Sequence, residues 1–443
     1  MKSGPALDAG GKSAGLPAVP TAEILAVGSE MLTPFRLDTN SLSITEFLDG
    51  LGIRVRAKTV VGDDRQELSA RLAAAIERSS VVFVTGGLGP TGDDVTREAV
   101  ADALGMPLEE DEEVVEHIRA RFERRGMQMP SNNRKQALVP RGAIRLDNPL
   151  GTAPGVWIER DGGVVVLMPG PPAEMKAMLE GPVRERLAPL AGGLRIFRRT
   201  VRTWGRSESH IDEAARPIYG RWAGAAEPVE CTILAVQGEI ALHLSTSDTD
   251  AERASNRLDE VVGELVDVLG QVVFSTDGRG LDEVVGSMLR ERGLRLAAAE
   301  SCTGGLLASR LTDVPGSSDY FERGVVCYSN QAKMELLGVA AGDIAVHGAV
   351  SEVVALAMAR GVRELGGVDI GAGITGIAGP SGGSEQKPVG TVFVAVSDRQ
   401  GEEARRYRFV GSRSFVKHQS VQAALDMVRR RIMEPAKDRG EED

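Results

Sequence analysis

The sequence predicts an α/β protein that is divided into several domains. Short apolar segments that end in glycine alternate with longer segments of helical spacing over most of the 443 residues, and this alternation is typical of βαβ units on a parallel sheet. At roughly 100–200 residues per domain, the length predicts two to four domains. The pattern changes over residues 195–275, where strand-like segments dominate, and this change marks a separate middle domain.

The first α/β unit begins at residue 22. Its predicted strands are 22–28, 53–61 and 80–87, and its predicted helices are 41–52, 65–79, 97–105 and 172–187. Residues 140–172 are irregular and rich in glycine and proline, apart from a buried strand in GGVVVLMPGPP. Strands that alternate with helices in this way predict a parallel sheet.

The two later regions differ from each other in pattern. The middle region has predicted strands in 195–205, 232–247 and 271–277 and helices in 208–220 and 251–270, which predicts a small α+β domain. The last region is again α/β, with predicted strands 294–301, 321–330, 368–376 and 390–398 and helices 281–293, 353–367 and 412–433. We therefore expect a flexible leader at 1–21 and domains at 22–190, 195–275 and 280–435.

Composition excludes several classes of protein. The net charge is -11 and the sequence pI about 5.2, whereas a nucleic-acid surface usually shows a basic excess; we expect no nucleic-acid partner. The three cysteines, Cys231, Cys302 and Cys327, are far apart, so neither a zinc cage nor a disulfide framework is expected. No run of about 18 uncharged apolar residues exists, and the leader lacks an apolar signal core. We expect no membrane span and a cytoplasmic location.

Two glycine-rich strand exits carry the candidate chemistry of the N-terminal domain. VGSEMLTPFRLDTN (27–40) and TGGLGPTGDDVT (85–96) each follow a predicted strand. Ligands of open parallel sheets bind at the carboxyl ends of strands, and glycines let backbone N–H groups approach phosphate. Asp93 and Asp94 offer oxygen ligands for Mg²⁺ or Mn²⁺. The alternative is that the glycines only form a turn and Asp94 only caps a helix.

The C-terminal domain holds a second set of polar segments after its strands. These are AESCTGG (299–305), GSSDYFERGVVCYSNQAK (316–333), GITGIAGPSGG (373–383) and FVGSR (409–413). GAGITG (371–376) matches G-x-G-x-x-G, but the dinucleotide-binding motif needs a helix directly after its glycines. Gly379-Pro380-Ser381-Gly382-Gly383 does not start a helix readily, so we reject that interpretation.

The N-terminal motifs resemble the first domain of the competence/damage-inducible CinA family. The segments that carry the resemblance are GSE, DTN, GGLGPTGDD, NR-QA (133–137), GTAPG (151–155) and PGPPAEM (169–175). The resemblance implies a three-layer α/β sandwich related to molybdopterin-binding proteins, with metal-dependent hydrolysis of ADP-ribose to AMP and ribose 5-phosphate. It implies nucleotide contacts at Gly28, Glu30, Asn40, Gly86, Gly87, Gly89, Thr91 and Asp93, with a divalent metal (Mg, Mn or Co) at Asp93 and Asp94. TPFRL (33–37) departs from the family pattern and leaves contacts near Pro34 and Arg36 open.

The C-terminal motifs resemble the nicotinamide mononucleotide amidohydrolase domain of the same family. ESCTGG, the Gly-Ser-Ser pair, YSN-x-x-K, GAVS, TGIAGP and KPVGTV carry this resemblance over nearly all of 281–432, and the one departure is Cys327 before Tyr328. The resemblance implies Ser318 as nucleophile, Lys333 as its base and Tyr328 as the residue that orients them, without a cofactor. Implied substrate contacts are Glu300, Ser301, Thr303, Gly304, Asn330, Thr375, Gly376 and Arg413.

Other interpretations of these residues stay open. Ser317 and Ser318 are common turn residues, Lys333 is of a type that is mostly solvated, and Cys302 is a rival nucleophile. For the whole chain, the first expectation is a bifunctional enzyme of pyridine-nucleotide salvage that acts on small nucleotides as a homodimer. The second is an amidase regulated by a non-catalytic nucleotide- or pterin-binding N-terminal domain.

Overall fold

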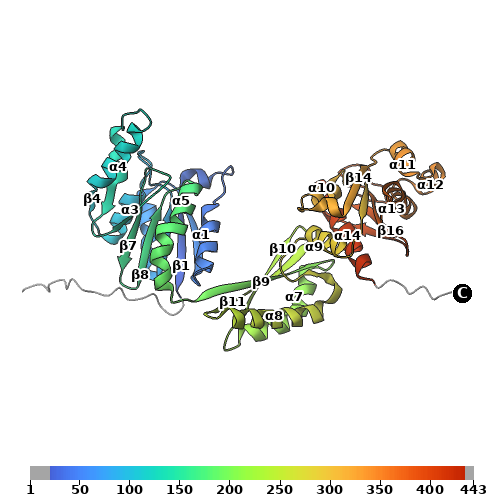
Figure 1. Cartoon of the computed structure of the whole chain (residues 1–443), viewed down its shortest axis with the longest axis horizontal. Coiled ribbons are helices and arrows are strands. Elements are labelled where there is room, and N and C mark those ends of the chain that lie inside the picture. Colours follow the sequence, from blue (N-terminus) through green and yellow to red (C-terminus); the bar gives the residue numbers. More distant parts are fainter. Residues whose placement is uncertain (1–19, 435–443) are drawn as a thin grey trace, which may run out of the picture. The chain divides into compact units, whose positions relative to one another are not determined.

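The chain forms two compact units, which Figure 1 shows with their helices and strands labelled. The computed structural model describes residues 20–434. One unit runs to residue 197 and includes 246–255, and the other comprises 198–245 and 256 onward. The predicted leader, 1–21, lies outside the described residues apart from its last two, since β1 begins at Thr21.

The N-terminal domain is built on a six-stranded sheet in the order β2-β1-β3-β8-β7-β6. Its strands are β1 (Thr21–Val27), β2 (Arg54–Val61), β3 (Val81–Thr85), β6 (Ile144–Leu146), β7 (Gly155–Arg160) and β8 (Gly163–Met168). The four strands β2, β1, β3 and β8 are parallel, and β7 and β6 add antiparallel strands at one edge. The predicted parallel sheet is thus confirmed.

Helices cover both faces of this sheet and make the domain a three-layer sandwich. Its helices are α1 (Asn40–Asp49), α2 (Arg65–Arg78), α3 (Thr96–Leu104), α4 (Glu112–Glu123), α5 (Pro172–Met178) and α6 (Arg184–Leu187), and a small ladder joins β4 (Leu108–Glu110) to β5 (Leu138–Pro140). Alternate residues of the strands enter two separate cores. One core packs α1 and α5 against Ile24 and Phe83, and the other packs α2 and α3 against Leu25 and Val84.

Two details of this domain differ from the sequence predictions. The predicted helix 172–187 is interrupted because Gly181 has non-helical backbone angles and Pro182 follows it, and proline lacks the N–H that a continuous helix needs. The predicted irregular region 140–172 contains β6 and β7, which pair with each other and with β8.

The middle region has the β-α-β-β-α-β order of a split βαβ domain. Its elements are β9 (Arg195–Trp204), α7 (Glu208–Ala223), β10 (Glu230–Val236), β11 (Glu239–Asp248), α8 (Ala251–Leu269) and β12 (Val273–Ser275). The strands form one sheet in the order β10-β11-β9-β12. This is the small α+β domain that the sequence predicts.

The C-terminal domain has a five-stranded sheet in the order β14-β13-β15-β16-β17. Its strands are β13 (Leu296–Glu300), β14 (Phe321–Val326), β15 (Ile370–Gly376), β16 (Thr391–Asp398) and β17 (Gly401–Arg408), and its helices are α9 (Leu281–Glu291), α10 (Leu306–Thr312), α11 (Asn330–Leu337), α12 (Ala341–His347), α13 (Glu352–Gly366) and α14 (Arg413–Met433). β14 and β15 run parallel to β13, whereas β16 is antiparallel to β15 and β17 is antiparallel to β16.

No helix follows the glycines of β15, because the next element is the strand β16. This confirms the rejection of a dinucleotide-binding motif.

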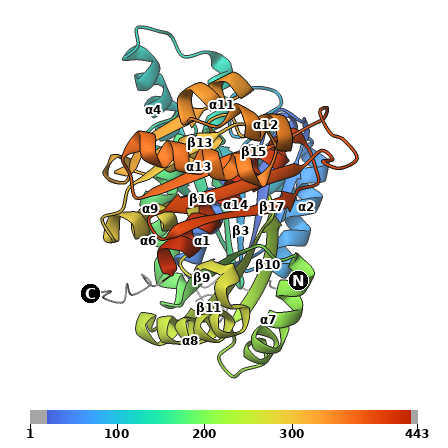
Figure 2. The ribbon, with the colours of Figure 1, turned by 90° about the vertical axis from the view of Figure 1, so that its right-hand side faces the viewer.

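This sheet is also covered on both faces. One core contains residues of α9, α10 and α14, and the other contains residues of α11 and α13. Figure 2 shows α13 lying across β15 and β16. Trp204 of β9 and Phe274 of β12 belong to the first core, so part of the middle domain is packed into the C-terminal domain. Within residues 20–434, no helix is long and apolar enough to span a membrane.

Candidate active sites

The ends of two neighbouring parallel strands bring Ser301 and Lys333 together. Ser301 directly follows β13, and its backbone N–H donates to the carbonyl of Ile374 on β15 at 3.0 Å. The adjacent strand β14 is followed by α11, whose start is capped by the Ser329 hydroxyl. Lys333 lies at the end of the first turn of α11. Both side chains are buried, at 7% exposed for Ser301 and 1% for Lys333.

The Lys333 ammonium nitrogen has three oxygen neighbours. It lies 3.1 Å from the Ser301 hydroxyl oxygen, 2.9 Å from the carbonyl oxygen of Cys327 and 3.3 Å from that of Tyr328. Burial lowers the pKa of Lys333 from its ordinary value, because the charged form loses hydration. A neutral amine has two N–H donors and one lone pair. Donation to the two carbonyls therefore leaves the lone pair for the serine hydroxyl.

Glu300 stabilises the glycine turn that follows Ser301. Its carboxylate accepts hydrogen bonds from the backbone N–H groups of Gly305, Leu307 and Ala308 at 2.8–3.1 Å and is fully buried. These N–H groups belong to the start of α10, where helix donors have no partner within the helix. The expectation that Glu300 contacts substrate is wrong, because its carboxylate is enclosed by this turn.

Three other predicted contacts lie around the same turn. Thr303 is fully buried and its hydroxyl has no hydrogen-bond partner among the described residues. Thr375 is buried, and its hydroxyl donates to the carbonyl of Ala349 at 2.8 Å. Gly376 ends β15, and a Cβ there would approach Val392 and Thr391 within 3 Å. Thr375 and Gly376 are thus engaged in contacts within the domain.

Two cationic side chains, Arg413 and Lys417, lie close to the turn that follows Ser301. The guanidinium of Arg413 donates to the Tyr328 hydroxyl at 3.0 Å and to the carbonyl of Gly379 at 2.7 Å. The Lys417 ammonium lies 3.7 Å from where a Cβ on Gly304 would stand. Arg413 and Lys417 project from the first turns of α14, next to a turn that begins at Ser301. Asn330 is exposed at the start of α11.

The structure does not place Ser318 near Lys333. Ser318 lies in a 3-10 turn, Ser317–Asp319, before β14, and the first residue of β14 pairs with the first residue of β13. Lys333 lies beyond the other end of β14. A six-residue strand spans roughly 16 Å, and α11 continues from this strand without returning to its start. The predicted contact between Ser318 and Lys333 is therefore wrong, and Ser301 is the serine that contacts Lys333.

Cys302 is a poor rival nucleophile in this environment. Its side chain is 5% exposed, and burial raises the pKa of the thiol to about 12. Only the thiolate is strongly nucleophilic. Cys302 therefore packs as a small apolar residue, as it does in the core with Leu307 and Ile374.

The N-terminal domain has two hollows at the carboxyl ends of its parallel strands. The first, of about 410 Å³, is lined by Glu30, Arg36, Asn40 and Gly86 among others. The second, of about 260 Å³, is lined among others by Gly87, Gly89, Asp94 and Glu174. Both include Gly170 and Pro171, so they meet at this loop. Arg36, whose role the sequence left open, thus faces the first hollow.

Backbone conformation and close contacts explain why glycine stands at positions 28 and 86 of the two strand exits. Gly86 has a φ of +102°, and a Cβ there would stand 2.2 Å from the carbonyl oxygen of Val27. Asn40 donates from its amide to the Thr85 hydroxyl and to the carbonyl of Gly170. Gly28 is followed closely by the Glu30 carboxylate, which would collide with a Cβ. These predicted nucleotide contacts therefore lie near the carboxyl ends of the parallel strands.

Asp94 organises the loop rather than projecting freely from it. Its carboxylate accepts hydrogen bonds from the N–H groups of Gly89 and Thr91 and from the Thr91 hydroxyl, at 2.8, 2.9 and 2.5 Å. Asp93 is exposed beside it, and the neighbouring Thr91 side chain lowers the pKa of the Asp93 carboxyl. Among residues 20–434, no three His, Cys, Asp or Glu side chains are arranged to hold a metal. These carboxylates alone are too few for a metal cage and fit an ion only together with ligand phosphates.

Comparison with known proteins agrees with this three-part organisation. The family described as probable molybdopterin binding domain matches residues 23–189, the CinA KH domain family matches 198–275, and the CinA C-terminal domain family matches 279–432. A CinA-like protein of Koribacter versatilis is 47% identical over 416 residues, which cover 93% of this chain and 100% of the relative. The chain belongs to the CinA family.

Two further proteins are similar to this chain, one over most of its length and one over about a third of it. A putative competence-damage inducible protein of Acetivibrio thermocellus is 42% identical and covers 93% of this chain and 98% of its own length. A crystal structure of a CinA superfamily protein from Klebsiella pneumoniae is 40% identical, covers 34% of this chain and 95% of its own, and has a TM-score of 0.34.

From the sequence, Ser301 is predicted only as a substrate contact, and Lys417 is not predicted at all. The position of Ser301 offered a signal, since it directly follows a strand, whereas Ser318 precedes one. Lys417 lies one helical turn after Arg413, a spacing that places both side chains on one face of α14.

Proposed function

We propose that the C-terminal domain hydrolyses the carboxamide of nicotinamide mononucleotide, with Ser301 as nucleophile and Lys333 as general base. The observation that carries the proposal is the contact of 3.1 Å between a buried lysine nitrogen and a buried serine hydroxyl. A serine needs an adjacent base to become a nucleophile. A lysine becomes that base when burial holds it in its neutral form.

The reaction then follows from the two side chains. The Ser301 oxygen attacks the carboxamide carbon while its proton passes to the nitrogen of Lys333. The C–N bond breaks, and Lys333 returns the proton to the departing ammonia, leaving an ester on Ser301. A water molecule, deprotonated by Lys333, hydrolyses the ester to the carboxylate and restores the hydroxyl. No step requires a metal.

The positive charge beside the Ser301 turn supports a phosphorylated substrate. Arg413 and Lys417 supply two cations beside the turn that holds Ser301. An arginine fork suits the oxygens of a phosphate monoester. In nicotinamide mononucleotide, the reacting amide lies at one end of the molecule and the phosphate at the other. The phosphate charge is complementary to the two cations.

The test is ammonia release from nicotinamide mononucleotide by single variants of the full chain. Ser301→Ala should be nearly inactive, and Lys333→Met should lose about 10²–10⁴ in rate. Ser318→Ala is the matched control and should keep wild-type activity, because Ser318 is exposed at the opposite end of β14. Full activity of Ser301→Ala would exclude this mechanism.

For the N-terminal domain we propose hydrolysis of ADP-ribose to AMP and ribose 5-phosphate. The support is the pair of adjoining hollows at the strand ends, with the strained Gly86 turn between them. A divalent ion held by Asp93 and the ligand phosphates would neutralise charge on the phosphoanhydride. Arg36 and the loop that Asp94 fixes would position the nucleotide.

The alternative for this domain is a nucleotide-binding module that controls the amidase without chemistry of its own. AMP formation from ADP-ribose separates the two. Asp94→Ala should abolish AMP formation and leave ammonia release unchanged, and EDTA should do the same. Ammonia release that responds to ADP-ribose, with no AMP formed, would favour the regulatory module.

A further inference from the structure

The larger of the two hollows in the N-terminal domain is lined by charged groups that have no partner. It has a volume of about 410 Å³, and we call it the α1 hollow, because the start of α1 forms part of its wall. Among residues 20–434, neither the Glu30 carboxylate nor the Arg36 guanidinium makes a hydrogen bond or an ion pair. These opposite charges line the same hollow without pairing with each other, so each is available to a ligand.

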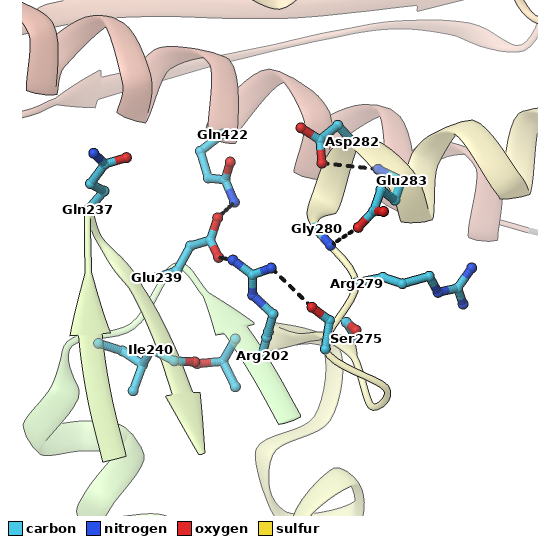
Figure 3. A network of polar contacts seen from close by, with 12 residues as sticks. Arg202, Gln237, Glu239, Ile240, Ser275, Arg279, Gly280, Asp282, Glu283 and Gln422 are labelled. Carbon is cyan, nitrogen blue, oxygen red and sulfur yellow. Dashed lines mark hydrogen bonds and ion pairs between the residues drawn. The ribbon is translucent and has the colours of Figure 1, made fainter. Parts of the chain in front are cut away.

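Comparable carboxylates elsewhere in the chain are already bonded. Glu239, at the contact between the middle and C-terminal domains, accepts hydrogen bonds from Arg202 and Gln422, as Figure 3 shows. Asp94, in the smaller hollow of the N-terminal domain, accepts three hydrogen bonds from its own loop. These carboxylates have a structural role that accounts for them, whereas the fold gives no such role to the carboxylate in the α1 hollow.

The start of α1 adds buried polar groups without partners. Asn40 lines the hollow, and its side-chain N–H groups donate to the Thr85 hydroxyl at 3.2 Å and to the carbonyl of Gly170 at 2.8 Å, which fixes its orientation. The Oδ1 of Asn40 is buried and has no donor within the described part of the chain. The same holds for the hydroxyl of Ser41, which is 2% exposed. Since buried polar groups are almost always hydrogen-bonded, we expect a ligand to supply a donor to Asn40.

The groups that line the α1 hollow define the chemistry of its ligand. A carboxylate only accepts hydrogen bonds, so Glu30 and the Oδ1 of Asn40 both require donors, such as hydroxyls. A guanidinium only donates, and it suits the oxygens of a phosphate. No aromatic ring from residues 20–434 lines the hollow, so it offers no stacking surface to a nucleobase. A phosphorylated sugar carries the donors and the phosphate that these groups require.

We propose that the α1 hollow recognises a ribose 5-phosphate unit, with the phosphate on Arg36 and the 2-hydroxyl on Glu30. This inference rests on the proposed hydrolysis of ADP-ribose, which contains the unit twice, once with adenine and once without. The α1 hollow and the smaller hollow share Gly170 and Pro171, so a diphosphate at this junction extends into both. Glu30 then selects ribose over 2-deoxyribose, because a site built to bond a hydroxyl rejects the analogue that lacks it.

Isothermal titration calorimetry of the full chain tests the proposal. Ribose 5-phosphate is compared with 2-deoxyribose 5-phosphate, and AMP with 2′-deoxy-AMP. All proteins carry Arg413→Ala, so that phosphate binding beside Ser301 does not contribute. We expect the ribose compound of at least one pair to bind about tenfold or more tightly than its deoxy counterpart, because a hydrogen bond to a charged group is lost. The pair that shows the preference identifies which half of ADP-ribose occupies the hollow.

Three further variants assign this preference to the α1 hollow. Glu30→Gln should lose the preference, because the charged acceptor is gone. Arg36→Ala should weaken both members of the pair alike, because both carry the phosphate. Glu46→Gln is the matched control: Glu46 is exposed on α1, lies outside the hollow and should keep the preference.

Three outcomes would overturn the proposal. One is equal affinity for the ribose and deoxyribose compounds in both pairs, and another is a preference that persists in Glu30→Gln. The third is displacement of the bound compound by inorganic phosphate at the same concentration, which would mean that the sugar contributes nothing. A preference for ribose in a chain that forms no AMP from ADP-ribose would remove the proposed hydrolysis and leave this inference standing, and AMP formation without the preference would do the reverse.

Discussion

The surroundings of Lys333 do little to stabilise its charged form. Its nitrogen is enclosed by two carbonyl oxygens and a hydroxyl, and none of these neighbours is a carboxylate. Burial is the largest cause of its lowered pKa. The same burial that lowers the stability of the ammonium form makes the neutral nitrogen available to Ser301.

The pH profile of ammonia release should report this lysine. Only neutral Lys333 accepts a proton, so kcat/KM should rise as pH increases through its pKa. Because that pKa is lowered, the rise should have its midpoint below 10.5, the ordinary value for lysine. Lys333→Arg, which stays charged throughout, should be inactive at every pH. A profile that stays flat from pH 5 to 10 would contradict this role.

Alkylation of cysteines should leave the proposed amidase activity intact. The Cys302 thiol has a pKa raised to about 12 by burial, so almost no thiolate exists at neutral pH to react with iodoacetamide. We expect full ammonia release after treatment with this reagent, and Cys302→Ala should retain most activity. Rapid inactivation of wild type, but not of Cys302→Ala, would argue for a thiol in the reaction.

At the scale of elements, one carboxylate supports the start of α10. Glu300→Ala should leave three N–H groups of this buried turn without acceptors and lower the free energy of unfolding by about 1–3 kcal/mol. Glu335→Ala removes an exposed carboxylate that, within residues 20–434, bonds Gln331 alone; it is the matched control and should change stability little. Urea denaturation measures both. Equal midpoints for the two variants would show that Glu300 does not stabilise the turn.

The burial of each strand explains which strands the sequence pattern predicts correctly. Continuous apolar strands such as 80–87 and 294–301 were identified because burial on both faces leaves few polar residues in them. The edge strand β17, GEEARRYR, was missed because it has no alternation and carries charges along an exposed edge, which is common for edge strands.

Part of the candidate site can also be predicted from the order of strands and polar residues. Ligands of parallel sheets bind at the carboxyl ends of the strands. Ser301 follows β13 and Lys333 follows β14, so the rule favours Ser301. No sequence pattern could show that Glu300 turns inward or that Asp94 binds its own loop, because those contacts depend on the path of the backbone.

At the scale of the whole molecule, we predict a homodimer. Two-fold dimers are the commonest oligomers of soluble proteins. Light scattering at micromolar concentration should give about twice the monomer mass of 47.0 kDa. A species at the monomer mass would refute the prediction.

The packing of β9 and β12 against α14 decides where this chain can be divided. A fragment that begins at residue 280 would lose Trp204 and Phe274 from its core and leave Gln422 without Glu239. A fragment that begins at Arg195 keeps all three partners. The shorter fragment should therefore melt at a lower temperature and aggregate more readily, and an inactive short fragment would say nothing about its catalytic residues. For expression of the C-terminal domain as a separate protein, the useful boundary precedes the middle domain.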